Sequence, residues 1–315
     1  MELDFDDIEL IGTVDVIIPT YKPGEKFVKL IDHLHRQTIR PKNIFVINTE
    51  EDLYDLDVTD RYDDVKLTHI TKAEFDHGGT RNMGASMSNA DFLLFMTDDA
   101  VPKNSRLIEE LLKAFYDEKV AASYARQLGD RKANYLEYYT RCFNYPKESR
   151  LKTKDDIDEL GIKTFFCSNV CAMYRKSAYD EAGGFVLKAI FNEDMMMAAT
   201  LIEMGYGIYY AADARVVHWH NYSAIQQFHR NFDVAVSQQM FSGSLTEVKS
   251  ESEGIRLVKT TLKHLIKRAK IHLIPKFIVQ SGFKYMGYKL GSNYKKMPKW
   301  LIKKLSLNPS FWDEN

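Results

Sequence analysis

Short apolar runs alternate with helical patterns through the first half of the chain, and this alternation limits the fold more than any other feature. Val14–Ile18 has the pattern of a strand, residues 27–34 repeat their apolar side chains at helical spacing, and Ile44–Ile47 returns as a second strand. A third short strand is expected near residues 66–70, and Phe92–Met96 is apolar at every position. The pattern predicts an α/β domain with helical crossovers, in which ligands bind at the carboxyl ends of the strands.

The net charge of −1 conceals an uneven distribution of charge. The chain has 43 Lys and Arg and 44 Asp and Glu, but fourteen basic residues and no acidic one lie between Gly254 and Trp312. The apolar residues of this tail recur at spacings of three and four, as in a basic amphipathic helix: Ile255, Val258, Leu262, Leu265 and Ala269. Each Lys or Arg contributes about 1 kcal/mol near an anionic membrane. The tail is therefore expected to bind an anionic membrane surface, although a simple solvated face and a nucleic acid are the alternatives.

Bulk features exclude several classes of protein. A chain with 45% hydrophobic and 12% aromatic residues is neither disordered nor collagen-like. The three cysteines are odd in number and form no C-x-x-C motif, which favours a reducing compartment. The acidic start, Met1–Asp7, lacks the features of a signal peptide, and no apolar run approaches the ~20 residues of a membrane span. We expect a cytoplasmic protein that associates peripherally with the inner face of the membrane.

Two adjacent carboxylates, Asp98 and Asp99, follow the buried strand Phe92–Met96. Asp is common in turns and caps, and Pro102 suits the start of a helix, so a structural role is one interpretation. The other is that a carboxylate at this strand end binds Mg²⁺ or Mn²⁺, which bridges substrate phosphates.

Two histidines, His218 and His220, are separated by one residue and point to the same side if the stretch is extended. Such a pair is often structural. Beside a metal-binding carboxylate, each becomes a candidate ligand or a donor to a diphosphate. A zinc hydrolase is disfavoured because no H-E-x-x-H motif is present.

Two further clusters precede predicted helices. Phe75–Asn82 contains a Gly-Gly turn, and its Arg81 could meet an anionic nucleotide near the start of a helix. Glu193 and Asp194 fall in the first turn of another helix. Favourable interaction with the helix dipole explains these acids simply, whereas a general base is the functional alternative.

Taken together and in this order, the clusters resemble family 2 of the inverting glycosyltransferases, which have the GT-A (nucleotide-diphospho-sugar transferase) fold. The resemblance covers roughly residues 13–242. Three segments resemble the bacterial rhamnosyltransferase branch, which uses dTDP-L-rhamnose: Phe75–Asn82, Thr97–Pro102 and His218–Ser223. The chain length and basic tail are similar to those of streptococcal-type enzymes that build rhamnose cell-wall polysaccharides.

The resemblance implies a mixed central sheet followed by a basic helical extension. Residues 1–128 would form the half that binds the nucleotide sugar, residues 129–250 the acceptor-binding and catalytic half, and residues 251–315 the basic tail. The resemblance also implies that Asp194 is the catalytic base. Asp99 occupies the last position of the family's D-x-D motif and would bind Mn²⁺ or Mg²⁺, with His218 or His220 as a further metal ligand.

The same resemblance assigns a donor-binding set. Its members are Pro19, Thr20, Tyr21, Asn48, Glu50, Arg81 and Asp98. Asn48 stands where the family usually has an Asp that reads the base, so Glu50 or Glu51 is expected to share this task. Thr97 stands where the D-x-D motif has its first Asp, and Asp98 is expected to substitute for it.

The resemblance predicts transfer of L-rhamnose from dTDP-β-L-rhamnose, with inversion, to a saccharide that is linked to a lipid. One alternative keeps the fold but uses a UDP-hexose or UDP-N-acetylhexosamine donor, and another is a non-catalytic nucleotide-binding or sugar-binding protein. A membrane-tethering or nucleic-acid-binding module centred on the tail is a third. Since no nucleic-acid-binding motif is present, we expect no nucleic acid partner. The sequence leaves open whether the chain forms a homo-oligomer.

Overall fold

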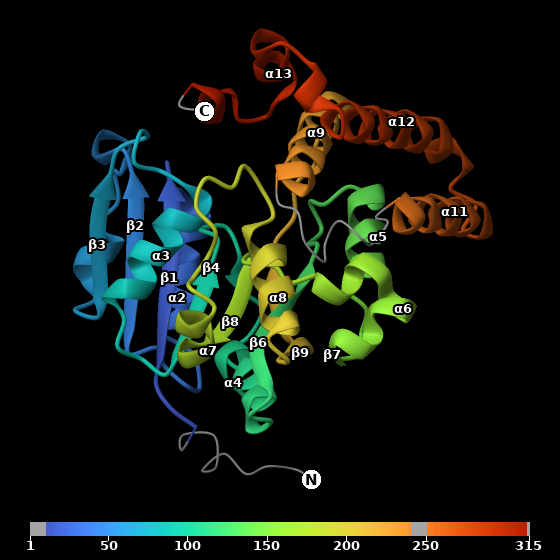
Figure 1. The fold of residues 1–315 in the computed structure, drawn as a ribbon. Helices are drawn as coiled ribbons and strands as arrows, with labels where there is room; N and C mark the ends of the chain where they lie inside the picture. The colour runs from blue at the N-terminus through green and yellow to red at the C-terminus, as the bar shows by residue number, and fades with distance from the viewer. Residues whose placement is uncertain (1–10, 241–250, 314–315) are drawn as a thin grey trace. The chain divides into compact units, whose positions relative to one another are not determined.

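The computed structural model describes residues 11–240 and 251–313, which form two compact units (Figure 1). Unit 1 consists of Met1–Asp130, Tyr145–Lys188 and Glu193–Trp219, and unit 2 consists of Arg131–Asn144, Ala189–Asn192 and His220–Asn315. The acidic N-terminus and the expected boundary after residue 250 lie outside the described residues. The division into functional parts at residues 128 and 250 stays a prediction.

The described strands all belong to unit 1 and form a single sheet. Their order is β3-β2-β1-β4-β8-β6-β9-β5, and β7 pairs with β9. The strands are β1 (Val14–Tyr21), β2 (Asn43–Thr49), β3 (Val65–Ile70), β4 (Phe92–Met96), β5 (Val101–Pro102), β6 (Val120–Leu128), β7 (Arg150–Lys152), β8 (Cys171–Arg175) and β9 (Gly207–Val217).

The sheet is mixed, which confirms the predicted fold class. Strands β3, β2, β1 and β4 run parallel, whereas β8 is antiparallel to both β4 and β6. The carboxyl ends of β1, β2 and β4 therefore meet at one edge of the sheet (Figure 1). Tyr209–Tyr210 and Val216–Val217 belong to one continuous strand, β9, whose pairing with β6 shifts register after Ala211.

Helices cover both faces of this sheet. Val16 and Ile18 of β1 pack in a core with α2 (Glu25–Leu34) and α4 (Leu107–Leu112). Ile17 points to the other face and lies under Gly84 of α3 (His77–Met87), where an added Cβ would meet the Ile17 side chain at 2.5 Å. Burial on both faces explains why β1 and β4 are apolar at nearly every position.

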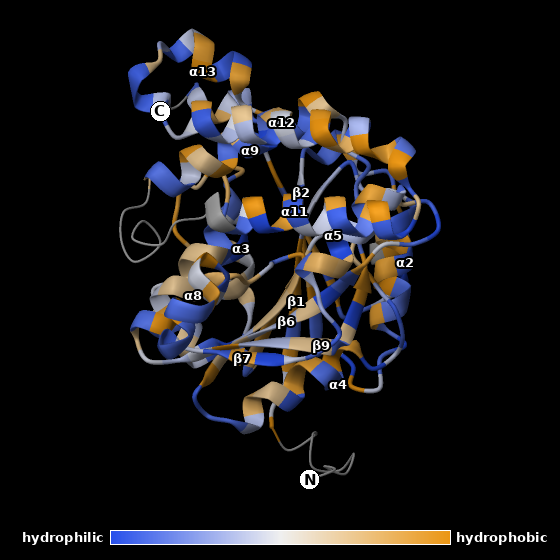
Figure 2. Ribbon diagram, turned by 90° about the vertical axis from the view of Figure 1, so that its right-hand side faces the viewer, coloured by the Kyte–Doolittle hydropathy of each residue, from blue (hydrophilic) through white to orange (hydrophobic). Residues whose placement is uncertain are grey.

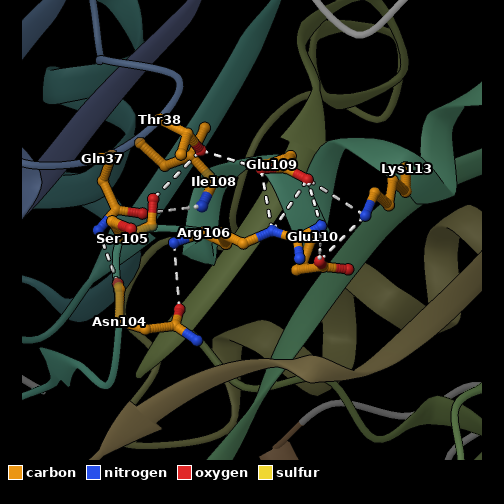
Figure 3. Close-up of polar contacts among 9 residues, drawn as sticks. All are labelled: Gln37, Thr38, Asn104, Ser105, Arg106, Ile108, Glu109, Glu110 and Lys113. Carbon is orange, nitrogen blue, oxygen red and sulfur yellow. Dashed lines mark hydrogen bonds and ion pairs between the residues drawn. The ribbon is translucent and has the colours of Figure 1, made fainter. Parts of the chain in front are cut away.

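A buried carboxylate anchors α4 to the loop that follows α2 (Figure 3). Glu109 is 1% exposed, and its carboxylate is 2.6 Å from Arg106 Nη2 and 3.2 Å from Lys113 Nζ. The Thr38 hydroxyl donates a hydrogen bond of 3.0 Å to the same carboxylate. Gln37 joins the network by accepting the Ile108 backbone N–H at 3.3 Å. These bonds hold α4 against the body of unit 1.

The remaining helices complete the two units. Unit 1 contains α3 (His77–Met87), α6 (Ile157–Leu160), α7 (Lys176–Glu181) and α8 (Glu193–Glu203). Unit 2 contains α5 (Tyr135–Asn144), α9 (Ala224–Met240), α11 (Glu251–Lys267), α12 (Ile274–Gly291) and α13 (Lys299–Leu305). The helices described for the tail confirm the expected helical extension. Among the described residues, no helix has both the length and the apolar character that crossing a membrane requires.

A capping box begins α9. The Ser223 backbone N–H donates to Gln226 Oε1 at 2.9 Å, and the Gln226 N–H donates to the Ser223 hydroxyl at 3.3 Å. Phe228 and Phe232 are buried on the apolar face of α9. Ile225 is instead 51% exposed, because it lies in the first turn of α9, ahead of the positions that the unit 2 core covers.

Candidate active site

The edge where β1 and β2 end is ordered by the buried amide of Asn48. Thr20 and Asn48 are paired across the two strands, and the Thr20 hydroxyl donates to Asn48 Oδ1 at 3.0 Å. Asn48 Nδ2 donates to the Glu50 carbonyl oxygen at 3.0 Å and lies 3.1 Å from Nδ1 of His69. Asn48, which was predicted to read the base, thus uses its amide within the protein and holds the loop that follows β2.

Glu50 turns the chain sharply at this edge. Its backbone has a φ of 67°, in the left-handed region that non-glycine residues rarely occupy. The Asn48 bond and a 2.5 Å hydrogen bond from the Lys72 backbone N–H to the Glu50 carboxylate hold this conformation. The carboxylate of Glu50 therefore also organises the loop.

Tyr21 presents an exposed aromatic ring at the end of β1. The ring is 43% exposed, and Lys22 Nζ and Lys72 Nζ each lie 5.3 Å from its centroid. A hydrogen bond with Lys72 is the main cause that lowers the pKa of the Tyr21 phenol. Pro19, earlier on β1, is partly exposed. The sequence analysis did not single out Lys22 and Lys72. These lysines follow the parallel strands β1 and β3, and two cations at one edge of the sheet favour the binding of an anion there.

The two carboxylates after β4 have different surroundings. Burial, followed by the charge of Asp99, raises the pKa of Asp98 to about 6, although the Tyr21 backbone N–H donates to it. Asp99 accepts a hydrogen bond of 3.2 Å from the Thr97 hydroxyl and lies 3.5 Å from Lys26 Nζ. Thr97, which replaces the first Asp of the motif, thus orients the remaining metal-ligand candidate.

His218 follows β9 and faces Asp99. Its Nε2 is 3.4 Å from Asp99 Oδ1, and its Nδ1 is 2.9 Å from Oε1 of Gln127. An amide oxygen only accepts hydrogen bonds, so Nδ1 carries the proton and Nε2 is the nitrogen that faces the carboxylate. Asp99, His218 and His220 form a group of the described residues that could hold a metal ion.

Asp194 lies in the first turn of α8, surrounded by protein on most sides. Its carboxylate accepts the backbone N–H of Asn169 at 3.1 Å and that of Met195 at 2.8 Å. Burial, followed by the negative charge of Glu193, raises its pKa to about 7. A carboxyl with this pKa can exchange a proton near neutral pH, as a general base must.

Glu193 forms an ion pair, whereas Asp194 forms none with the residues that the structure describes. It lies 3.3 Å from Arg81 Nη1 and accepts a hydrogen bond of 3.3 Å from Asn169 Nδ2. Burial alone would raise the pKa of Glu193, but the charges of Arg81 and His77 outweigh it and lower the pKa. Arg81, which was predicted to contact the nucleotide, is 6% exposed and bonds to Glu193 and to the His77 carbonyl oxygen.

A chain of buried polar side chains links the two parts of the site. Gln127, which holds His218, donates through Nε2 to the Ser168 hydroxyl at 3.0 Å. The next residue, Asn169, binds both Glu193 and Asp194. Sequence reasoning missed these three residues because each is a single polar residue outside any motif. Their position was the only signal, since Gln127 lies near the end of β6 and Ser168 and Asn169 lie just before β8.

Carboxylates at the end of a central parallel strand, with an aspartate in the first turn of a helix beside the same sheet, are compatible with a transferase that acts on nucleotide-activated sugars. Comparison with known proteins agrees with this class. The chain belongs to glycosyl transferase family 2, whose model matches residues 15–183. The predicted family and the glycosyltransferase activity are therefore confirmed.

Relatives extend the similarity beyond the family domain. The chain is 36% identical over 308 residues to O-antigen chain rhamnosyltransferase RfbN of Salmonella typhimurium strain LT2, covering 95% of this chain and 96% of the relative. It is 37% identical to O-antigen chain rhamnosyltransferase WbaN of Salmonella anatum over 307 residues, 95% of each chain. The fold resembles that of the mannosyltransferase PcManGT from Pyrobaculum calidifontis, solved with GDP-Man and Mn²⁺. The TM-score is 0.59 at 12% identity, and the match covers 91% of this chain and 88% of the other.

Proposed function

We propose that the chain transfers L-rhamnose from dTDP-β-L-rhamnose to a saccharide acceptor during synthesis of a surface polysaccharide. The observation that carries this proposal is the identity of 36–37%, over 95% of the chain, to two O-antigen chain rhamnosyltransferases. Inversion at the anomeric carbon of a β-linked donor gives an α-linked rhamnoside. The similarity to streptococcal-type enzymes stays a prediction.

Asp194 is the base in this proposal. It takes the proton of the acceptor hydroxyl while that oxygen forms a bond to the anomeric carbon, and the bond from the anomeric carbon to dTDP breaks on the opposite face. The N–H groups of Asn169 and Met195 hold the carboxylate in place. The Asp194 pKa of about 7 supports the assignment because the group is partly ionised at neutral pH and still basic enough to take a proton.

Asp99, His218 and His220 are the residues that we assign to a divalent cation. They fit Mn²⁺ or Mg²⁺ because Asp99 offers a carboxylate oxygen and Gln127 directs the Nε2 lone pair of His218 toward it. When bound, the ion would neutralise negative charge on the diphosphate of the donor. The Mn²⁺ in the PcManGT complex supports a divalent cation in this fold.

The donor nucleotide is assigned to the edge formed by β1 and β2. Tyr21 offers an exposed ring for the base, Pro19 lies two residues earlier on β1, and Asp98 accepts a hydrogen bond from the Tyr21 backbone. Thr20, Asn48 and Glu50 shape this edge through their hydrogen bonds within the protein. Arg81 has an indirect role in this proposal. It pairs with Glu193, whose charge affects the pKa of Asp194, and it does not bind phosphate.

The acceptor is assigned to a lipid-linked oligosaccharide, which the inner face of the cell membrane would present. The fourteen basic residues of the tail support an anionic membrane as partner, and the absence of a nucleic-acid-binding motif in the sequence disfavours the alternative. The enzyme would then be cytoplasmic and peripherally bound.

The test is transfer from dTDP-rhamnose to a short synthetic rhamnosyl acceptor in the presence of Mn²⁺, with the product linkage read by NMR. UDP-glucose, UDP-N-acetylglucosamine and GDP-mannose serve as competing donors. Formation of an α-rhamnoside from the dTDP donor alone supports the proposal. Transfer from a UDP donor, with none from dTDP-rhamnose, would replace rhamnose with another sugar.

A further inference from the structure

One face of α12 exposes apolar side chains along most of the helix. Ile278, Val279, Tyr285 and Met286 are 57%, 53%, 59% and 46% exposed, and Leu290 is 38% exposed. The other four residues lie one, seven, eight and twelve positions after Ile278, which places all five on a single side of an α-helix. Figure 2 shows that much of the ribbon of α12 has the orange colour of hydrophobic residues. We call this set of five residues the apolar face of α12.

The opposite side of α12 is occupied by α9. Phe277, Gly287 and Gly291 are the buried residues of α12. A Cβ added at either glycine would meet a backbone carbonyl oxygen of α9 at 2.2 Å, that of Phe228 for Gly287 and that of Phe232 for Gly291. The two helices therefore touch along their backbones, and the apolar face points away from this contact.

The charge of α12 has one sign. The helix carries Lys276, Lys284 and Lys289 and no acidic residue, and none occurs in the sequence from Gly254 to Trp312. By helical spacing, Lys276 and Lys289 lie beside or within the apolar face, whereas Lys284 lies on the side of Gly287 and Gly291, toward α9. Exposed apolar side chains continue on the neighbouring tail segments at Ile271 and Trp300, which are 61% and 68% exposed. An apolar stripe with cations beside it matches a surface that is apolar within and anionic at its boundary.

We propose that the apolar face of α12 inserts into the headgroup region of an anionic bilayer, with Lys276 and Lys289 on the lipid phosphates. The inference rests on the membrane partner of the proposed function and names the surface that binds it. A second copy of the chain is a poorer occupant, because dimerisation through this face would bring two highly basic tails together. Anionic lipids neutralise the same charges.

Partitioning of the full-length chain onto vesicles tests the inference. The vesicles are phosphatidylcholine, alone or with about 30 mol% phosphatidylglycerol to give the anionic surface. The combined variant Ile278→Ser, Tyr285→Ser and Met286→Ser keeps every charge of the tail. We expect it to bind the anionic vesicles at least about tenfold more weakly than the unmodified chain, since binding scales with buried apolar area. The matched control is Ile225→Ser, an exposed apolar residue of α9 outside the basic tail, and it should bind as the unmodified chain does.

An environment-sensitive fluorophore locates the contact directly. A nitrobenzoxadiazole probe on Ile278→Cys, in a Cys142→Ser background that removes the exposed native thiol, should brighten and shift to the blue with anionic vesicles. The same probe on Ile225→Cys should not change. Unaltered binding of the triple variant, or an unaltered probe at position 278, overturns the inference. So does a concentration-dependent dimer that the triple variant abolishes without any vesicle binding.

Transfer to a water-soluble acceptor separates this inference from the proposed function. The triple variant should retain that activity, because none of its residues belongs to the assigned site. Loss of vesicle binding with retained transfer supports the inference. Vesicle binding through α12 by a chain that transfers no rhamnose would refute the proposed function and leave the docking surface intact.

Discussion

Replacing Glu193 with Gln removes the negative charge next to Asp194 and keeps a side-chain oxygen that can accept the Asn169 amide. In the structure, this negative charge is the second cause, after burial, that raises the Asp194 pKa to about 7. The substitution also leaves the Arg81 charge unneutralised beside Asp194, and a cation favours the ionised carboxylate. Both effects lower the Asp194 pKa.

The size of the effect follows from the order of the causes. The Asp194 pKa rises from its ordinary value of 3.8 to about 7, and burial, which the substitution preserves, is the larger cause. We therefore expect the pKa to fall by about one unit, a tenfold change in proton affinity or about 1.4 kcal/mol. At pH 6, the ionised fraction of Asp194 would rise from roughly one tenth to roughly one half, so activity relative to its high-pH plateau would rise about fivefold.

The assay is kcat/KM for transfer, measured from pH 5 to pH 9 with saturating Mn²⁺. The acid limb of the unmodified enzyme should have its midpoint near pH 7, since the base must be ionised, and that of the Glu193→Gln variant about one unit lower. Glu203→Gln is the matched control, because it removes an exposed carboxylate from the other end of α8. Thermal denaturation of each variant reports whether the loss of the Arg81 partner destabilises the fold. Identical acid limbs for all three proteins would refute the coupling of Glu193 to the base.

Four further outcomes are expected. Asp194→Asn should lower the transfer rate by about 10²-fold to 10⁴-fold, the usual contribution of a general base, with donor affinity by calorimetry nearly unchanged; retained transfer would exclude Asp194 as base. Chelation of the divalent cation should stop transfer, and Asp99→Asn should weaken Mn²⁺ binding measured by electron paramagnetic resonance. Gln127→Leu should weaken the same Mn²⁺ binding by about 10-fold to 100-fold, because His218 loses the partner that fixes its tautomer, and unchanged affinity would contradict that role. Gly287→Ala should destabilise the protein by about 1–3 kcal/mol in urea denaturation, because its Cβ would meet α9, whereas Gly282→Ala has open space and should not.

The parallel half of the sheet was predictable because its signals are local. An apolar run such as Phe92–Met96 buries both faces of a strand, and the polar residues at its two ends mark where it stops. The antiparallel placement of β8 between β4 and β6 had no such signal, because strand order depends on pairing between residues far apart in the sequence. The irregular register of β9 was missed for the same reason.

The candidate site likewise contains residues that local sequence patterns could predict and residues that they could not. Asp99 and Asp194 could be singled out because acids at a strand end and in the first turn of a helix form recognisable local patterns. The roles of Asn48 and Arg81 could not, because the residues that occupy their side chains, such as Thr20 and Glu193, are distant in sequence. Gln127 and Asn169 gave no local signal at all, yet they connect the two halves of the site.

The sequence by itself determined the strands and helices of the parallel half, the acidic residues available for chemistry and the separation of a basic tail from an acidic body. These depend on the residue types within a few positions of each other. Only the tertiary structure decided that Glu193 pairs with Arg81 while the pKa of Asp194 is raised, and which side of α12 faces α9. Both depend on burial and on charges brought together from distant segments, since a carboxyl has an ordinary pKa until the fold excludes water from it and fixes its neighbours.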